Sequence, residues 1–164
     1  MSRKEEVFEC LQRLGIKYEC HEHPAAPTVE VAKQYVTDIP GVQHCKNLFL
    51  RNHKGTKHYL VIFDWNQNLP IRNLEQRLKQ GSLSFASEGR MMKYLGVSPG
   101  SVSLFGLIND TENHVHLFID KNLERSVKLS FHPNDNTASL IITNEGFRHF
   151  LTECGNSYEY IDLY

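Results

Sequence analysis

The sequence predicts a single α+β domain in which helices flank a mixed, largely antiparallel sheet. Its 164 residues, of which 40% are hydrophobic and 23% charged, are typical of one folded domain with its own core. Segments with strand and helix periodicity follow one another without regular alternation of the two types. No internal repeat or long low-complexity linker divides the chain, so we assign residues 1–164 to one domain.

The first part of the chain predicts two helices. The apolar stripe of the first helix consists of Val7, Phe8, Leu11 and Leu14. Gly15 follows where a C-terminal cap belongs. After a loop over residues 24–27, Thr28 can cap a second, shorter helix. The apolar face of that helix consists of Val29, Ala32 and Tyr35.

The middle of the chain predicts a β-hairpin and two further helices. Residues 47–51 and 58–63 are rich in Leu, Phe, Val and Ile, and a turn-like sequence separates them. Pro70 can open a helix that runs to about Lys79. Ser87 can cap another that reaches Leu95, just before a loop rich in Gly and Pro.

The last part of the chain predicts four strands and one helix. Strands are expected at residues 115–120, 127–131, 139–143 and near 158–161. A helix is expected from about residue 145 to residue 153, between the last two strands.

Charge is distributed unevenly along the chain. The formal net charge is only -1, but residues 44–93 carry nine Lys or Arg and three acids, a net charge of +6, which leaves -7 for the rest. Such a basic segment favours one surface that faces nucleic-acid phosphates, although ordinary solvated faces explain it as well. Within it, the candidate phosphate contacts are Arg51, Lys54, Arg90 and Lys93.

The chain carries no sign of secretion, membrane insertion or a metal centre. It lacks the apolar N-terminal run of a signal peptide and any stretch of about 18 apolar residues, so we expect a cytoplasmic protein with no membrane partner. Its four cysteines form no CxxC pair and are expected to be free thiols. The histidines at 21 and 23, and at 114 and 116, have strand spacing but no further ligand, so we expect no metal.

The usual catalytic motifs are absent, and polar residues interrupt apolar strands at three places instead. No GxSxG, Walker, GxGxxG or HExxH motif occurs. Lys46 stands at the start of an expected strand, a Gly/Pro loop covers residues 95–103, and a His-Pro turn covers residues 131–137.

Five segments carry a resemblance to a known family. They are Lys46-Asn47-Leu48-Phe49-Leu50, Leu83-Ser84-Phe85-Ala86-Ser87, Leu95-Gly96-Val97-Ser98-Pro99-Gly100-Ser101-Val102, Phe105-Gly106-Leu107-Ile108-Asn109-Asp110, and Phe131-His132-Pro133 with Asn136-Thr137. Over nearly its whole length the sequence resembles YbaK-type aminoacyl-tRNA editing domains. It is most similar to their stand-alone branch, the prolyl-tRNA synthetase associated domain proteins, which deacylate alanyl-tRNA for proline. The branch that clears cysteinyl-tRNA usually has threonine after the lysine, whereas Asn47 stands here.

The resemblance implies a metal-free and cofactor-free hydrolase with three catalytic residues. An aminoacyl ester is already activated, so it needs a placed water and stabilisation of an oxyanion rather than a covalent nucleophile. Lys46 would stabilise negative charge, Asn47 would orient the ribose or the water, and His132 would position the 3′ end or the water. From the residues alone, a solvated lysine, a hydrogen bond at a strand end and a structural histidine remain possible.

The resemblance also places the amino-acid pocket in the Gly/Pro loop and the His-Pro turn. The expected substrate-binding residues are Gly96, Pro99, Gly100, Ser101 and Asn136. Backbone that closely approaches the amino acid can admit a methyl group and exclude the proline ring, and steric exclusion discriminates better than attraction to one methyl group. An ordinary tight loop is the alternative.

We therefore expect a trans-editing enzyme that removes alanine from proline tRNA, with the acceptor end of that tRNA as partner. Prolyl-tRNA synthetase is a further candidate partner, and DNA is not expected. One alternative is a deacylase for another small aminoacyl-tRNA, such as the cysteinyl or seryl form. The other is a catalytically silent module that binds tRNA or synthetase with the same fold.

Overall fold

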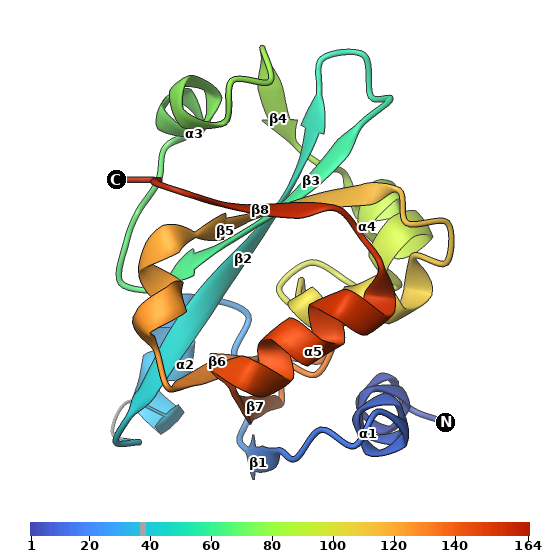
Figure 1. Ribbon diagram of the computed structural model, residues 1–164, viewed down its shortest axis with the longest axis vertical. Coiled ribbons are helices and arrows are strands. Elements are labelled where there is room, and N and C mark those ends of the chain that lie inside the picture. The colour runs from blue at the N-terminus through green and yellow to red at the C-terminus, as the bar shows by residue number, and fades with distance from the viewer. Residues whose placement is uncertain (37–38) are drawn as a thin grey trace.

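The computed structural model describes residues 1–36 and 39–164 (Figure 1). Its helices are α1 (Arg3–Arg13), α2 (Val29–Val36), α3 (Ile71–Leu78), α4 (Glu88–Leu95) and α5 (Asn144–Cys154), with 3-10 turns η1 (Leu104–Asn109) and η2 (Lys121–Arg125). Its strands are β1 (Glu19–Glu22), β2 (Val42–Asn52), β3 (His58–Asp64), β4 (Leu83–Phe85), β5 (Val115–Asp120), β6 (Lys128–Phe131), β7 (Ala138–Thr143) and β8 (Tyr158–Ile161). No helix within the described ranges is long and apolar enough to cross a membrane.

The strands form one mixed sheet in the order β1-β7-β6-β2-β3-β5-β8, and β4 pairs with β2 off this path. Among the described residues, the pairs β1–β7, β2–β3, β2–β4 and β6–β7 are antiparallel. The pairs β2–β6, β3–β5 and β5–β8 are parallel. The predicted α+β class with a mixed sheet is confirmed.

Strand β2 belongs to two halves of this sheet. Its first residues, 42–44, pair in parallel with β6, whereas residues 45–51 pair with β3 in an antiparallel hairpin. Pairing with β6 ends at His44 and Ser130, where the two strands separate. In Figure 1 the strand runs from the end of the molecule that holds β1 and β7 to the end that holds β4 and α3.

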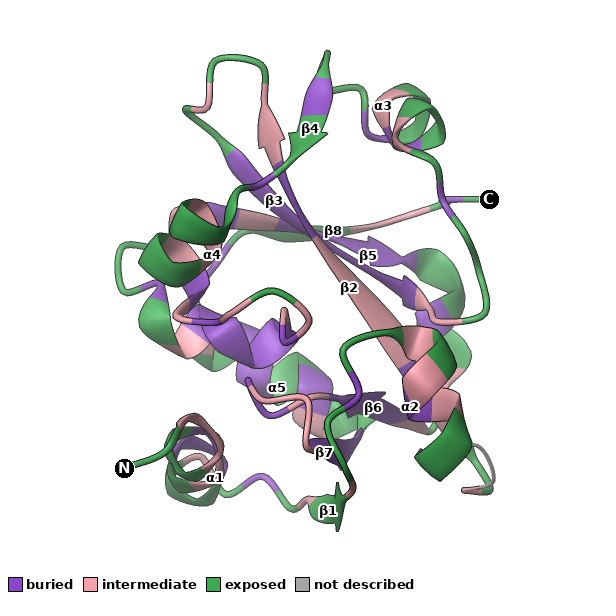
Figure 2. Ribbon diagram, turned by 180° about the vertical axis from the view of Figure 1, so that it is seen from behind, coloured by how far each residue is buried: buried purple, intermediate pink, exposed green. Residues whose placement is uncertain are grey.

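Two apolar clusters hold these halves together. The larger cluster packs α1, α5 and η1 against the sheet, with Phe105, Phe147 and Phe150 fully buried at its centre. The smaller cluster packs α3 and the C-terminal segment against the hairpin half, around Phe63 and Leu74. Figure 2 shows β3 and β5 largely buried, whereas the outer faces of the helices are exposed.

The helix signals in the sequence correspond to the observed helix ends. Ser87 Oγ accepts the backbone N–H of Arg90, and Thr28 Oγ1 accepts that of Val31, as N-terminal caps do. Gly15 has a positive φ of 70° just after α1, a conformation that glycine adopts without steric cost. The hairpin, α3 and the four C-terminal strands also form where they are expected, with shifts of a few residues.

Two strands and part of a third were not expected. Strand β1 is an edge strand whose four residues are all exposed, so it has no apolar alternation to detect. Strand β4 has only three residues. Strand β2 begins at Val42 rather than Asn47, because its first residues pair with β6, a partner distant in the sequence.

Candidate active site

A pocket of about 310 Å³ opens where β2 and β6 separate. Residues of β2 form one wall, and the end of β6 with the start of β7 forms the other. Helix α2 with the loop before it, the loop that contains Gly100, Phe85 of β4 and Met91 of α4 complete the lining. Where β2 and β6 separate, neither strand covers the backbone and side chains of the other. The space between them is the cavity, so the fold itself produces it.

Lys46 and His132 stand at equivalent positions on the two sides of this split. His44 and Ser130 are the last paired residues, and Lys46 and His132 each follow two residues later. Both side chains are half-buried and line the pocket. Lys46 makes no ion pair or side-chain hydrogen bond with any described residue, so its ammonium group remains available to a substrate.

Asn47 is held in one orientation by the backbone of η1. Its Oδ1 accepts the N–H of Leu104 at 3.1 Å. Because the oxygen is engaged, the amide nitrogen Nδ2 is the group that Asn47 can offer to the pocket, and it can only donate. Lys46 and Asn47 therefore make the β2 wall a wall of hydrogen-bond donors.

His132 has the opposite character. Its Nδ1 lies 3.0 Å from the carbonyl oxygen of Ala138, which can only accept, so Nδ1 carries the proton. Burial lowers the pKa of His132 below its ordinary value, although the Ala138 carbonyl opposes that shift. The neutral ring then presents Nε2 as an acceptor. Ser103 donates to the His132 carbonyl oxygen and connects this wall to the loop before η1.

The predicted loop residues have different places. Gly100 lines the pocket with φ +83°, and a Cβ there would lie 3.1 Å from Cβ of Pro27, which also lines it. Asn136 lies behind this loop and donates to the Gly100 carbonyl oxygen at 3.3 Å. Pro99 and Ser101 flank Gly100 in the loop without lining the pocket.

Gly96 does not line the pocket. It adopts φ +65° as the C-terminal cap of α4, and a Cβ there would lie 2.6 Å from Nδ2 of Asn109. Its glycine is explained by the end of the helix and by this close approach.

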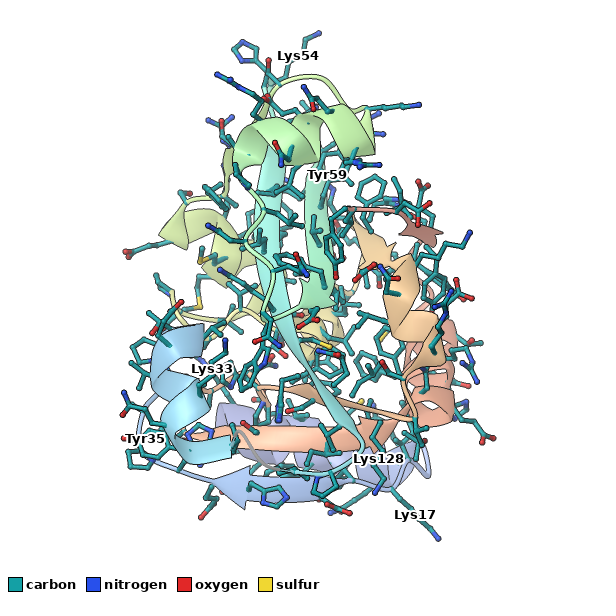
Figure 3. All side chains as sticks on the ribbon, turned by 90° about the vertical axis from the view of Figure 1, so that its left-hand side faces the viewer. Lys17, Lys33, Tyr35, Lys54, Tyr59 and Lys128 are labelled. Carbon is teal, nitrogen blue, oxygen red and sulfur yellow. The ribbon has the colours of Figure 1, made fainter. Side chains whose placement is uncertain are left out.

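The four predicted phosphate contacts gather near the far end of the β2–β3 hairpin rather than at the pocket. Arg51 donates to the carbonyl oxygens of residues 52 and 53, and Arg90 donates to that of Gly55. Lys93 lies over the ring of its neighbour Tyr94, 5.1 Å from the centroid. Figure 3 shows Lys54 at the opposite end of β2 from α2, which carries Lys33 and Tyr35. Arg51 lies five residues beyond Lys46, or about 16 Å along the strand.

Several residues that line the pocket were not among the predicted site residues. Trp65 stacks on His44 with ring centroids 4.3 Å apart, and Lys33 lies over the Trp65 ring. Burial lowers the pKa of His44 to about 4. Phe85 lines the pocket although 56% of it is exposed. The single tryptophan and the Phe85 segment were visible in the sequence, but only the fold places them at this cavity.

No three His, Cys, Asp or Glu side chains are arranged to hold a metal ion within residues 1–36 and 39–164. The four cysteines are free thiols, as predicted. The described residues that line the pocket include one lysine, Lys46, one carboxylate, Glu30, two histidines, His44 and His132, and amides, hydroxyls and apolar side chains. Such a site can bind an ester whose carbonyl develops negative charge.

Comparison with known proteins assigns this two-part mixed sheet to the class of aminoacyl-tRNA editing domains. Residues 23–150 match the model of the aminoacyl-tRNA editing domain family, and the chain belongs to this family. It is 38% identical to the prolyl-tRNA editing protein ProX of Acetoanaerobium sticklandii, over 99% of both chains. It is 34% identical to prolyl-tRNA synthetase associated domain-containing protein 1 of Danio rerio, over 92% of this chain and 82% of that protein.

Solved structures share the fold. A crystal structure described as a proposed trans-editing enzyme for prolyl-tRNA synthetase superimposes with a TM-score of 0.71 at 20% identity, over 99% of this chain and 98% of that one. The structure of a hypothetical protein, APE2540, also gives a TM-score of 0.71, at 17% identity over 95% and 98% of the chains.

Proposed function

We propose that this chain, acting as one domain over residues 1–164, is a trans-editing hydrolase. It cleaves the ester of alanyl-tRNA for proline and releases alanine and free tRNA. Its relatives are named as a prolyl-tRNA editing protein and as proteins with a domain associated with prolyl-tRNA synthetase, and these names support the substrate class. The observation that carries the reaction is the pocket with donors on one wall and acceptors on the other.

The donor wall accounts for stabilisation of the transition state. As water attacks the ester carbonyl, negative charge develops on the carbonyl oxygen. Lys46 and Asn47 both line this cavity, and in the proposed reaction the ammonium group and the amide N–H groups hold this oxyanion. Lys46 also provides the positive charge that attracts the phosphate beside the terminal ribose.

The acceptor wall accounts for the proton. Neutral His132 accepts a proton from the attacking water at Nε2, while the Ala138 carbonyl holds Nδ1–H and so preserves the tautomer. The tetrahedral intermediate then collapses, the bond between the carbonyl carbon and the ribose oxygen breaks, and that oxygen takes the proton from the histidinium. Alanine and the free hydroxyl end of the tRNA are the products, so atoms and charge balance.

The loop around Gly100 sets the size of the amino-acid site. A Cβ at residue 100 would lie 3.1 Å from Cβ of Pro27, so the two segments of this wall approach each other closely. Asn136 donates a hydrogen bond to the Gly100 carbonyl oxygen. In the proposal this backbone wall excludes the proline ring by overlap and admits a methyl group, so cognate prolyl-tRNA escapes hydrolysis.

The basic hairpin end provides a surface for the tRNA away from the ester. Arg51, Lys54, Arg90 and Lys93 lie near one end of the molecule, and several phosphates of an acceptor stem could contact them. Docking on prolyl-tRNA synthetase would place the enzyme near newly released tRNA, and this partner is part of the proposal.

The experiment is deacylation of alanyl-, cysteinyl-, seryl- and prolyl-tRNA, all prepared on proline tRNA, by the wild-type protein and by Lys46→Ala. The proposal expects selective loss of alanine that falls about 10²- to 10³-fold in the variant. Loss of cysteine or serine instead would assign the other amino acid as substrate. Binding of tRNA without any hydrolysis would establish a silent module and refute the enzyme.

A further inference from the structure

The acceptor wall of the pocket extends beyond His132 to a second histidine. Strands β6 and β7 pair Phe131 with Leu140, so His132 and Ser139 come opposite each other one residue further on. Strand β1 pairs with β7 and brings His21 opposite Ser139, and His23 follows two residues later. Side chains at these positions share one face of the three strands.

A directed chain of hydrogen bonds runs through His23 to Ser139. Nδ1 of His23 lies 2.9 Å from the carbonyl oxygen of Pro24, an atom that can only accept, so Nδ1 carries the proton in the neutral ring. Nε2 is then an acceptor, and it lies 3.1 Å from Oγ of Ser139. In the neutral form of His23, the Ser139 hydroxyl therefore donates its hydrogen to Nε2.

This chain fixes what Ser139 offers to a ligand. Ser139 is 4% exposed and lines the same pocket as Lys46 and His132. Because its hydrogen is directed to His23, its remaining lone pairs can only accept. The imidazole that orients it is itself held by stacking on Tyr35, with ring centroids 5.7 Å apart.

We infer that Ser139, oriented by His23, binds the α-ammonium group of the aminoacyl ester. The inference rests on the proposed function and specifies how its substrate is oriented. An aminoacyl ester has one strong acceptor, the carbonyl oxygen, and one strong donor, the ammonium group. With the carbonyl against Lys46 and Asn47, the ammonium group is directed to the opposite wall, where Ser139 accepts a charge-assisted hydrogen bond. The reverse orientation would place the ammonium group against the Lys46 cation.

A carboxylate in the lining could attract the ammonium group instead of Ser139, and its substitution serves as the control. Glu30 is the one carboxylate among the described residues that line the pocket. It is exposed in the first turn of α2, where water screens its charge. Glu30→Gln removes this charge without changing the His23–Ser139 pair.

The test compares two substrates that differ only in the ammonium group. Alanyl-tRNA and propionyl-tRNA, prepared on the same proline tRNA, are hydrolysed at about pH 7, where the α-amino group is still largely protonated. Wild type, Ser139→Ala and Glu30→Gln are compared, and kcat/KM is measured for each pair. Dividing each variant by wild type on the same substrate removes the difference in intrinsic ester reactivity. Ser139→Ala is expected to lower kcat/KM about 10- to 100-fold for alanyl-tRNA and less than about threefold for propionyl-tRNA.

His23 is a positioning residue, and a second variant tests it. His23→Phe keeps an aromatic ring against Tyr35 but removes Nε2. It is expected to reduce the same substrate preference, by a smaller factor than Ser139→Ala, because the serine hydroxyl then loses its fixed direction. Ser139→Thr, which retains the hydroxyl, is expected to restore part of the preference.

Three results would overturn the inference. Equal losses on both substrates in Ser139→Ala would make the serine a structural residue. Loss of the preference in Glu30→Gln, with Ser139→Ala unchanged, would assign the ammonium to the carboxylate. Failure of the wild-type protein to hydrolyse either ester would refute the proposed function, and the inference would fall with it. The wild-type assay alone shows this result, so it is distinguished from failure of the inference before any variant is made.

Discussion

Replacing Asn47 by Asp separates its catalytic contribution from its structural one. The carboxylate keeps an oxygen where Oδ1 accepts the N–H of Leu104, but it replaces the donor Nδ2 by a second acceptor with negative charge. The β2 wall then loses one of its two donors to the oxyanion and gains a charge beside Lys46. The fold should remain intact while the chemistry fails.

The magnitude follows from the group that is lost. Removal of one oxyanion donor costs about 2.7–4 kcal/mol in the transition state, which corresponds to about 10²- to 10³-fold in kcat. Asn47→Ala should lose activity as well, and it also leaves the N–H of the buried Leu104 without a partner, at about 1–3 kcal/mol of unfolding free energy. Asn47→Asp should stay within about 1 kcal/mol of wild type in stability.

Single-turnover deacylation of alanyl-tRNA and urea unfolding measure the two effects on the same samples. Asn73→Asp, an identical change at an exposed site in the first turn of α3, is the matched control and should leave the rate unchanged. An Asn47→Asp enzyme that retains its rate within about threefold would show that the amide donates nothing to the reaction. The donor wall would then consist of Lys46 alone.

Four further predictions concern pH and two glycines. Burial lowers the pKa of His132, so its ring should stay neutral as the pH is lowered. The fall of kcat/KM on the acid side of the pH profile should therefore lie below about pH 6.5. His132→Asn should remove this fall from the profile. Gly100→Ala should lose about 1–2 kcal/mol of stability and alter amino-acid selectivity, because its Cβ would press on Pro27 beside the pocket. Gly96→Ala should lose stability with selectivity unchanged, and a selectivity change there would contradict the assignment of that glycine to the helix cap. Burial lowers the pKa of His44 to about 4 in the folded protein. Between about pH 6.5 and pH 4 the unfolded chain therefore binds more protons than the folded one, and the free energy of unfolding falls by about 3 kcal/mol as the pH falls. The urea midpoint of His44→Phe should depend less on acid pH than that of wild type.

Local signals predicted most helices and strands because they depend on neighbouring residues. A serine before α4 and a glycine after α1 satisfy the ends of those helices within the same few residues. Strand β1 escaped prediction because its four side chains are exposed and its pairing with β7 joins segments more than a hundred residues apart. No local pattern records such a pairing.

For the candidate site too, the sequence supplied some features and the tertiary structure supplied others. Lys46, Asn47 and His132 were selected through the resemblance of their segments, and the structure brings all three to one pocket. Their hydrogen-bonding directions depend on backbone atoms of distant or adjacent loops, at Leu104 and Ala138. The sequence also treated Gly96 and Gly100 alike, although only Gly100 reaches the pocket.

By itself the sequence determined the α+β class and the family resemblance, and through that resemblance it selected the candidate catalytic residues. The class follows from periodicity and capping residues, and the resemblance follows from a few short motifs, so both are properties of short segments. Only the tertiary structure decided that β2 leaves β6 after His44, that a cavity forms there, and that donors line one wall and acceptors the other. Those features arise from contacts between segments far apart in the chain, so their geometry exists only after the sheet has formed.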